Sequence, residues 1–229
     1  LDLSNNRIEH FADLSRCGQL RKLNLTNNRL TSILNTSVNE SLRELDLSGN
    51  SIPDLNTLGR FKNLTILRMR NCGIKSLKGV ESLSKLTVLD VAENIIKSLE
   101  PLKSLTRLKV LNAASNKLTQ VFEVRQLQTL TTLASVDFSG NAITEVKFYK
   151  HMVLNDLPFL LEMDGKKLSE KEFVETEVFF GADLVQKREI ADKYLGAGNF
   201  EDNRTMHSQM KEFKDIVTEP PKLYTADFY

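Results

Sequence analysis

The chain has 229 residues, of which 41% are hydrophobic and 27% charged, and its 31 basic and 30 acidic residues leave a net charge of +1. This balance gives no electrostatic footprint for nucleic acid or an anionic membrane surface, and no apolar run approaches the roughly 20 residues that a membrane-spanning helix needs. The two cysteines, Cys17 and Cys72, belong to no cysteine-rich cap, which indicates a reducing, intracellular compartment rather than secretion.

A short motif within residues 86–96 shows how the chain is organised. Leu86, Leu89 and Val91 are separated by three and then two residues, and Asn94 follows three residues after Val91. Residues two apart on a strand share one face, so Leu89 and Val91 should both point into the core. The chain must then turn, and the buried Asn94 side chain can bond backbone groups that the turn leaves unpaired. This spacing is that of the leucine-rich repeat, L-x-x-L-x-L-x-x-N-x-L.

The motif recurs in phase through residues 1–147, where we expect about seven repeats, the first of them truncated. Its asparagine position is occupied by Asn6, Asn28, Asn50, Cys72, Asn94, Asn116 and Asn141. Further apolar residues recur in steps of three after this position, a spacing that suits a 3₁₀ turn. The sequence therefore predicts an α/β solenoid, a leucine-rich repeat horseshoe with a parallel sheet on the concave side and short 3₁₀ turns, not full α-helices, on the convex side. We expect both cysteines to be buried structural residues.

The repeats are followed by a predicted cap over residues 148–169. The run 148–168 resembles the motif that closes intracellular leucine-rich repeat proteins, with Met163 in place of the usual leucine. We expect a short helix early in this run and a last strand that includes Met163. Ser169 and Glu172 form a capping-box pattern, S-x-x-E, which predicts a helix that starts just after Ser169.

Residues 170–229 are predicted to be a helical extension with an extended aromatic tail. Apolar residues suit a helix over 170–195 and a second helix over about 204–217, and the tail occupies residues 222–229. Two interpretations stay open: the helices fold back on the cap or the solenoid, or they dock into a partner. The candidate docking residues are Met206, Met210, Phe213, Tyr224, Phe228 and Tyr229.

The 22-residue repeats and the cap resemble the protein phosphatase 1 regulatory subunit class of leucine-rich repeat proteins, over residues 1 to about 170. That class also includes the spliceosomal A-prime protein, the leucine-rich axonemal dynein light chain and several ciliary proteins. The resemblance implies the fold but does not fix the function, because the class serves unrelated assemblies. It also implies a cytoplasmic protein in a cytoskeletal or ciliary assembly.

Side chains that alternate with the buried leucines should project from the concave face and supply a binding surface. Ile66, Val88 and Val110 would form an apolar row on three neighbouring strands, beside Arg68 and Arg70. An apolar patch with charges at its rim is typical of a protein-binding hot spot. The predicted binding residues are Ile66, Arg68, Arg70, Val88, Val110, Asp46, Asp90, Ala92, Asn112 and Ala114. The alternative is that Arg68 only pairs with the aspartates on the neighbouring strands and that the face binds nothing.

No motif for catalysis or cofactor binding stands out. His10, His151 and His207 have no partner at metal-ligand spacing, and neither a nucleophile elbow nor a phosphate-binding loop is present. We therefore expect no enzyme activity, metal, cofactor, small-molecule substrate, membrane or nucleic-acid partner. The leading hypothesis is a non-enzymatic scaffold for protein–protein interaction. The alternatives are a regulatory subunit of an enzyme such as a protein phosphatase, and a ribonucleoprotein component, which the missing basic patch disfavours.

Overall fold

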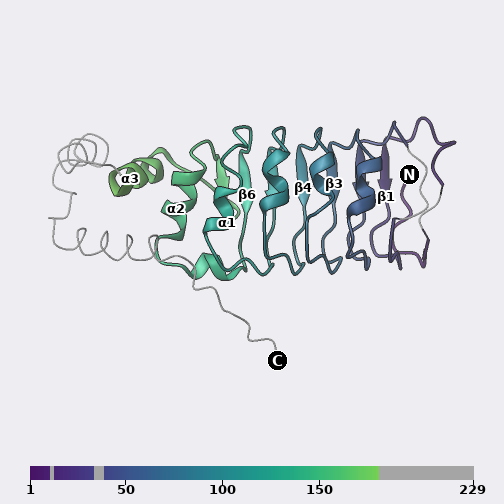
Figure 1. Ribbon diagram of the computed structural model, residues 1–229, viewed down its shortest axis with the longest axis horizontal. Helices are drawn as coiled ribbons and strands as arrows, with labels where there is room; N and C mark the ends of the chain where they lie inside the picture. The colour runs from purple at the N-terminus through teal and green to yellow at the C-terminus, as the bar shows by residue number, and fades with distance from the viewer. Residues whose placement is uncertain (11–12, 34–38, 181–229) are drawn as a thin grey trace, which may run out of the picture. The chain divides into compact units, whose positions relative to one another are not determined.

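The computed structural model describes residues 1–10, 13–33 and 39–180. The chain divides into two compact units, Leu1–Ser169 and Glu170–Tyr229, which are described separately. The first unit is a solenoid of stacked repeats, each of which contributes a short strand and a return segment (Figure 1). The stacking creates the hydrophobic core, because one repeat is too small to bury its own apolar face.

In the described residues, eight strands form one sheet in which every strand lies next to its successor in the chain. They are β1 (Lys22–Asn24), β2 (Glu44–Asp46), β3 (Ile66–Arg68), β4 (Val88–Asp90), β5 (Val110–Asn112), β6 (Ser135–Asp137), β7 (Glu162–Met163) and β8 (Lys166–Lys167). Strands β1 to β7 pair in parallel, because each repeat returns the chain to the same edge of the sheet, and β8 turns back to pair with β7 antiparallel. The central residue of β2 to β5 is a leucine that is almost completely buried.

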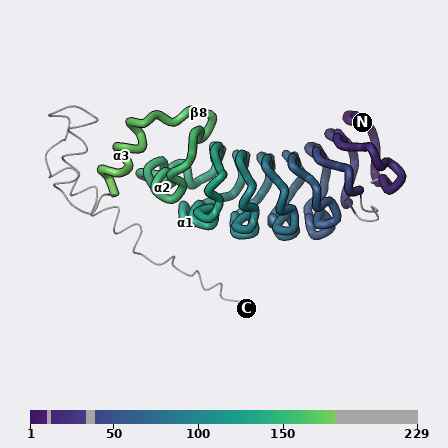
Figure 2. The backbone as a smooth tube through the Cα atoms, turned by 90° about the horizontal axis from the view of Figure 1, so that it is seen from above, coloured from purple at the N-terminus to yellow at the C-terminus, as the bar shows by residue number. Residues whose placement is uncertain are grey.

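The helical turns of successive repeats line up along one side of the solenoid, and the sheet forms the other side (Figure 2). The turns are η1 (Asn56–Arg60), η2 (Val80–Ser82), η3 (Glu100–Ser104) and α1 (Phe122–Arg125), and a further 3₁₀ turn, η4 (Ala142–Glu145), follows β6. The prediction of short 3₁₀ segments is confirmed for η1, η2 and η3. It is wrong for α1, which lies in the one repeat of 25 residues; the longer segment has room for a wider α-turn.

The buried asparagines join each repeat to the one before it. The Asn50 Oδ1 accepts the Leu30 N–H at 2.9 Å, and its Nδ2 donates to the carbonyl oxygens of Leu25 at 3.0 Å and Leu47 at 2.8 Å. The same pattern recurs at Asn28, Asn94, Asn116 and Asn141, all of them buried. The predicted role of this position is therefore confirmed: its side chain satisfies backbone groups that the turn would otherwise leave unpaired.

The two cysteines differ in environment. The Cys72 side chain is buried, its S–H donates to the Leu47 carbonyl at 3.2 Å, and burial raises its pKa to about 11, which confirms a structural role. The prediction that Cys17 is buried is wrong, because Cys17 is exposed in the structure. Asn39, at the equivalent position of the next repeat, is buried and donates to the carbonyl oxygens of Leu14 and Cys17 instead.

Helix α2 (Tyr149–Asp156) precedes β7, and its last residue, Asp156, contacts the 25-residue repeat that contains α1. The carboxylate of Asp156, whose side chain is 6% exposed, accepts a hydrogen bond from Gln128 Nε2 at 2.9 Å and faces Arg125 Nε at 3.4 Å. Burial raises the pKa of Asp156 despite the nearby guanidinium. These contacts connect α2 to α1 at the end of the solenoid.

In the second unit, helix α3 runs over Glu170–Phe180 and begins where the S-x-x-E pattern predicts. The rest of the predicted first helix, the second helix over 204–217, and all of the candidate docking residues from Met206 to Tyr229 lie outside the described residues. None of the helices in the described ranges has the length and apolar character of a membrane span.

Candidate functional site

The concave face carries two sets of side chains that run across the strands. The registers set Ile66, Val88 and Val110 directly opposite one another on β3, β4 and β5, and we call these three residues the apolar row. A second set, the polar column, consists of Asp2, Asn24, Asp46, Arg68, Asp90, Asn112 and Asp137. The structure thus brings together the strand residues that the sequence pattern selected.

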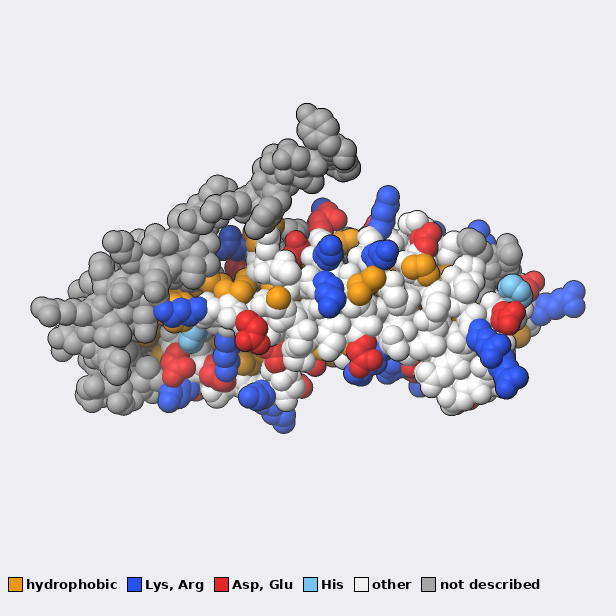
Figure 3. Space-filling view, turned by 90° about the horizontal axis from the view of Figure 1, so that it is seen from below, with side chains coloured by type: hydrophobic (Ala, Val, Ile, Leu, Met, Phe, Trp, Pro, Cys, Tyr) orange, Lys and Arg blue, Asp and Glu red, His pale blue; other side chains and the backbone are white. Residues whose placement is uncertain are grey.

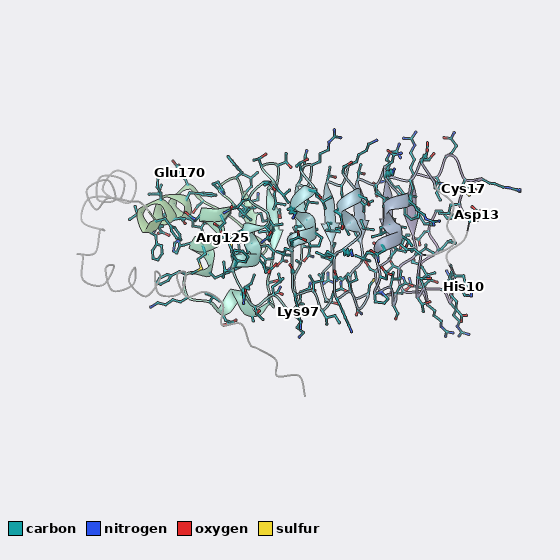
Figure 4. All side chains as sticks on the ribbon, in the orientation of Figure 1. His10, Asp13, Cys17, Lys97, Arg125 and Glu170 are labelled. Carbon is teal, nitrogen blue, oxygen red and sulfur yellow. The ribbon has the colours of Figure 1, made fainter. Side chains whose placement is uncertain are left out.

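The chain enters the strands at one edge of the solenoid and leaves them at the other. Cys17, which precedes β1, and Lys97, which follows β4, lie at these opposite edges (Figure 4). The polar column lies next to the edge at which the chain leaves, where charged side chains of both signs stand between small hydrophobic areas (Figure 3). The apolar row consists of the first residues of β3, β4 and β5, two residues before the polar column on each strand.

Most side chains of the polar column stabilise a turn in their own repeat, a role that the sequence analysis did not predict. The Asp46 Oδ1 accepts the Ser48 N–H at 3.0 Å, which closes a turn just after β2. The same bond to the residue two positions later is made by Asp2, Asn24, Asp90, Asn112 and Asp137. The recurrence of Asp and Asn was the available signal, because both accept such bonds from their own backbone. For Asn112 this task accounts for the residue type without any ligand.

Arg68 interrupts this column. A guanidinium has no acceptor, so the Arg70 N–H bonds the Ser48 Oγ at 3.2 Å instead. The Arg68 side chain is partly exposed, and no carboxylate among the described residues lies within the 4.0 Å of an ion pair with it. Pairing with the aspartates on the neighbouring strands therefore does not explain why an arginine stands at this position.

Arg70 has a fixed partner on the following repeat. Its Nη2 lies 2.8 Å from the Glu93 Oε1, both side chains are about half exposed, and this bond raises the pKa of Arg70. Glu93 has a left-handed backbone with φ of +58°, at a position where other repeats carry Asn27, Gly49, Asn71 and Ser115, all with positive φ. Such a conformation costs a residue like glutamate about 1 kcal/mol. The two arginines therefore differ: Arg70 is paired and Arg68 is available.

The apolar part of the face is smaller than the sequence suggests. Ile66 and Val88 are partly exposed and Val110 is 36% exposed. Ala92 is 0% exposed and Ala114 only 9%, so these two predicted binding residues add almost no surface to the face. A methyl group barely rises above the backbone, so the larger side chains around it screen it from solvent.

Comparisons with known proteins agree with this architecture. A profile described as Leucine-rich repeat matches residues 34–192, and a second, Leucine Rich Repeat, matches residues 19–39. The chain belongs to the leucine-rich repeat family. No curated protein matches the sequence significantly.

Several solved leucine-rich repeat structures are similar to the chain. Internalin C2 from Listeria monocytogenes has a TM-score of 0.59 and 22% identity, with 72% of this chain and 71% of that chain covered. The Drosophila melanogaster SNF/U2A′ complex gives 0.55 and 19%, covering 65% and 86%. Internalin F from Listeria monocytogenes gives 0.52 and 24%, covering 70% and 52%. At these identities the likeness shows a shared fold.

The leucine-rich repeat fold is typical of protein–protein interaction, and proteins of this fold generally act as non-enzymatic scaffolds. No group of three or more His, Cys, Asp or Glu side chains suited to a metal ion occurs in the described ranges. Among the described residues, the concave face offers Arg68, the apolar row and flanking carboxylates, a composition suited to a protein surface.

Proposed function

We propose that this protein is a non-enzymatic interaction scaffold whose concave face binds a protein partner at a central patch. The central patch consists of Asp46, Arg68, Asp90 and the apolar row. The single observation that carries the proposal is Arg68, which occupies a position where the fold uses Asp or Asn, gives up the turn bond, and has no ion-pair partner among the described residues. A fold-based reason favours Asn there, so we attribute the arginine to binding.

The chemistry of the patch suits a protein surface. Arginine is among the residues most enriched at interface hot spots, because its planar fork can bond a carboxylate twice while its stem packs on apolar groups. The apolar row lies beside it and would lose its remaining exposure on binding. The Drosophila structure is that of an SNF/U2A′ complex, and a protein partner for this chain is in keeping with that relative.

The proposed setting is the cytoplasm, within a cytoskeletal or ciliary assembly. Support comes from the resemblance of the 22-residue repeats and of the run 148–168 to the protein phosphatase 1 regulatory subunit class. We further propose the division into repeats over 1–147, a cap over 148–169 and an extension over 170–229. The position of α2, β7 and β8 at the end of the sheet supports the cap.

Affinity purification with mass spectrometry tests the proposal. Wild-type chain, Arg68→Glu and the matched control Arg107→Glu would be used as baits in one extract. Arg107 is exposed and has no ion pair among the described residues, so its reversal makes the same charge change away from the patch. We expect Arg68→Glu to lose a partner that the control retains. Equal recovery by both variants would count against the central patch. The recovered protein would also separate a structural assembly from a phosphatase or a ribonucleoprotein.

A further inference from the structure

The charges of the central patch alternate in a fixed order. Asp46, Arg68 and Asp90 lie directly opposite one another on β2, β3 and β4, so the face presents negative, positive and negative groups on successive strands. Each aspartate uses its Oδ1 for its own turn, and no described residue bonds the remaining oxygen. These three alternating charges are therefore available to a partner.

The spacing of this order matches an α-helix that lies across the strands. Neighbouring strands are about 4.8 Å apart, so the three charges span about 10 Å. One face of a helix repeats about every 5.4 Å, and two turns span about 11 Å. An extended segment repeats one face about every 7 Å and would span about 14 Å. The helix fits within about 1 Å, whereas the extended segment misses by about 4 Å.

Addition of a partner strand is excluded at this place. Strands β3 and β4 are paired on both sides within the sheet, so their backbone groups have no open edge. A partner must therefore recognise side chains rather than extend the sheet.

The apolar row gives the helix its orientation about its own axis. On β3 and β4 the row lies two residues from the polar column, which is about 7 Å along the strand. Neighbouring side chains on a helix surface are about 5–6 Å apart, so a stripe beside the charged one can reach the row. A helix of about three turns that runs along the solenoid over β2 to β5 would cover both sets at once.

We infer that the partner segment is an amphipathic helix with a basic, acidic, basic stripe in steps of three or four residues and an apolar stripe beside it. The acidic residue contacts Arg68, the basic residues contact Asp46 and Asp90, and the apolar stripe packs on the apolar row. The acidic residue is assigned to Arg68 rather than Arg70 because Glu93 already occupies Arg70. This inference rests on the proposed function and specifies the partner of the same face.

Three synthetic peptides labelled with a fluorophore would test it by anisotropy titration against the full chain. One peptide carries a Lys–Glu–Lys stripe beside a leucine stripe, one carries Glu–Lys–Glu with the same leucines, and one carries the first stripe with a central proline that prevents the helix. We expect the first peptide to bind at least tenfold tighter than the others. The variant Asp46→Asn/Asp90→Asn keeps the turn bonds, as Asn24 and Asn112 do, and should reduce that preference.

The outcomes separate this inference from the proposed function. Equal or tighter binding of the reversed or the proline peptide, together with a loss on Arg68→Glu, would overturn the helix while leaving the concave site in place. If Arg68→Glu binds the Lys–Glu–Lys peptide as tightly as wild type, and the affinity purification recovers the same partners with Arg68→Glu and with the control, both the helix and the concave site would be overturned. Absence of binding by all three peptides, while Arg68→Glu still loses a protein partner, would overturn the helix alone.

Discussion

Replacement of Arg68 by asparagine should separate the stability of the solenoid from its binding. The introduced asparagine would resemble Asn24 and Asn112, whose Oδ1 atoms accept an N–H two residues later. The new bond to the Arg70 N–H should contribute about 1 kcal/mol, the usual net value for a hydrogen bond. The substitution loses the 3.2 Å bond from Arg70 to Ser48 and a few tenths of a kcal/mol of attraction to the flanking aspartates. We expect the free energy of unfolding to rise by about 0.5 kcal/mol.

The mirror substitution Asn112→Arg supplies the matched control, because it removes the turn bond from a repeat that has it. It should lower the free energy of unfolding by about 1 kcal/mol. Both variants would be compared with wild type by urea unfolding followed by far-UV circular dichroism, and the Lys–Glu–Lys peptide would report binding. We expect Arg68→Asn to be at least as stable as wild type and to bind at least tenfold more weakly. A loss of more than about 1 kcal/mol on Arg68→Asn would refute the reasoning, since Arg68 would then support the fold itself.

Three further substitutions test other parts of the structure. Glu93→Asn should raise the free energy of unfolding by about 0.5 kcal/mol, because Asn tolerates the left-handed backbone better than Glu; a lower urea midpoint would contradict this. Cys72→Asn should raise it by about 1 kcal/mol, because the new Oδ1 can accept the N–H of buried Ile52, for which no described group is an acceptor; an unchanged thermal midpoint would count against it. Burial raises the pKa of Asp156, so the folded state holds this proton more tightly than the unfolded state, and that stabilisation is lost as pH rises through the folded-state pKa. The free energy of unfolding of Asp156→Asn should therefore fall less than that of wild type as pH rises from the ordinary aspartate pKa of 3.8 towards neutrality. Urea midpoints measured at several pH values test this. An equal dependence of the midpoint on pH in both proteins would contradict it.

The fold could be predicted because its determinants repeat. Leu89 and Asn94 stand in columns that recur in nearly every repeat, so single exceptions such as Cys72 do not obscure the pattern. The site was only partly predictable, because exposure depends on neighbours that one repeat does not contain. Ala92 lies on the predicted face but is fully buried, and Cys17 follows the core pattern but is exposed.

Backbone conformation was the other missing information. The sequence shows that Glu93 stands where most other repeats carry Asn or Gly, but only the structure gives its positive φ and its bond to Arg70. In the same way, alternating Asp and Asn in the polar column resembles a recognition surface until the turn bonds are seen. Arg68 stands out only once those turn bonds are known, because its side chain cannot accept one.

The buried asparagines should also influence where the solenoid begins to unfold. Each buried asparagine ties its repeat to the preceding one, and at Cys72 that tie lacks the bond to the Ile52 N–H. In a chain of nearest-neighbour contacts, cooperative unfolding divides where the coupling is weakest, so under denaturant or pulling force the solenoid should part between β2 and β3. A helix bound over β2 to β5 would span the contact between β2 and β3 and hold the two parts together. Binding of the partner should therefore make the solenoid more resistant to unfolding by force.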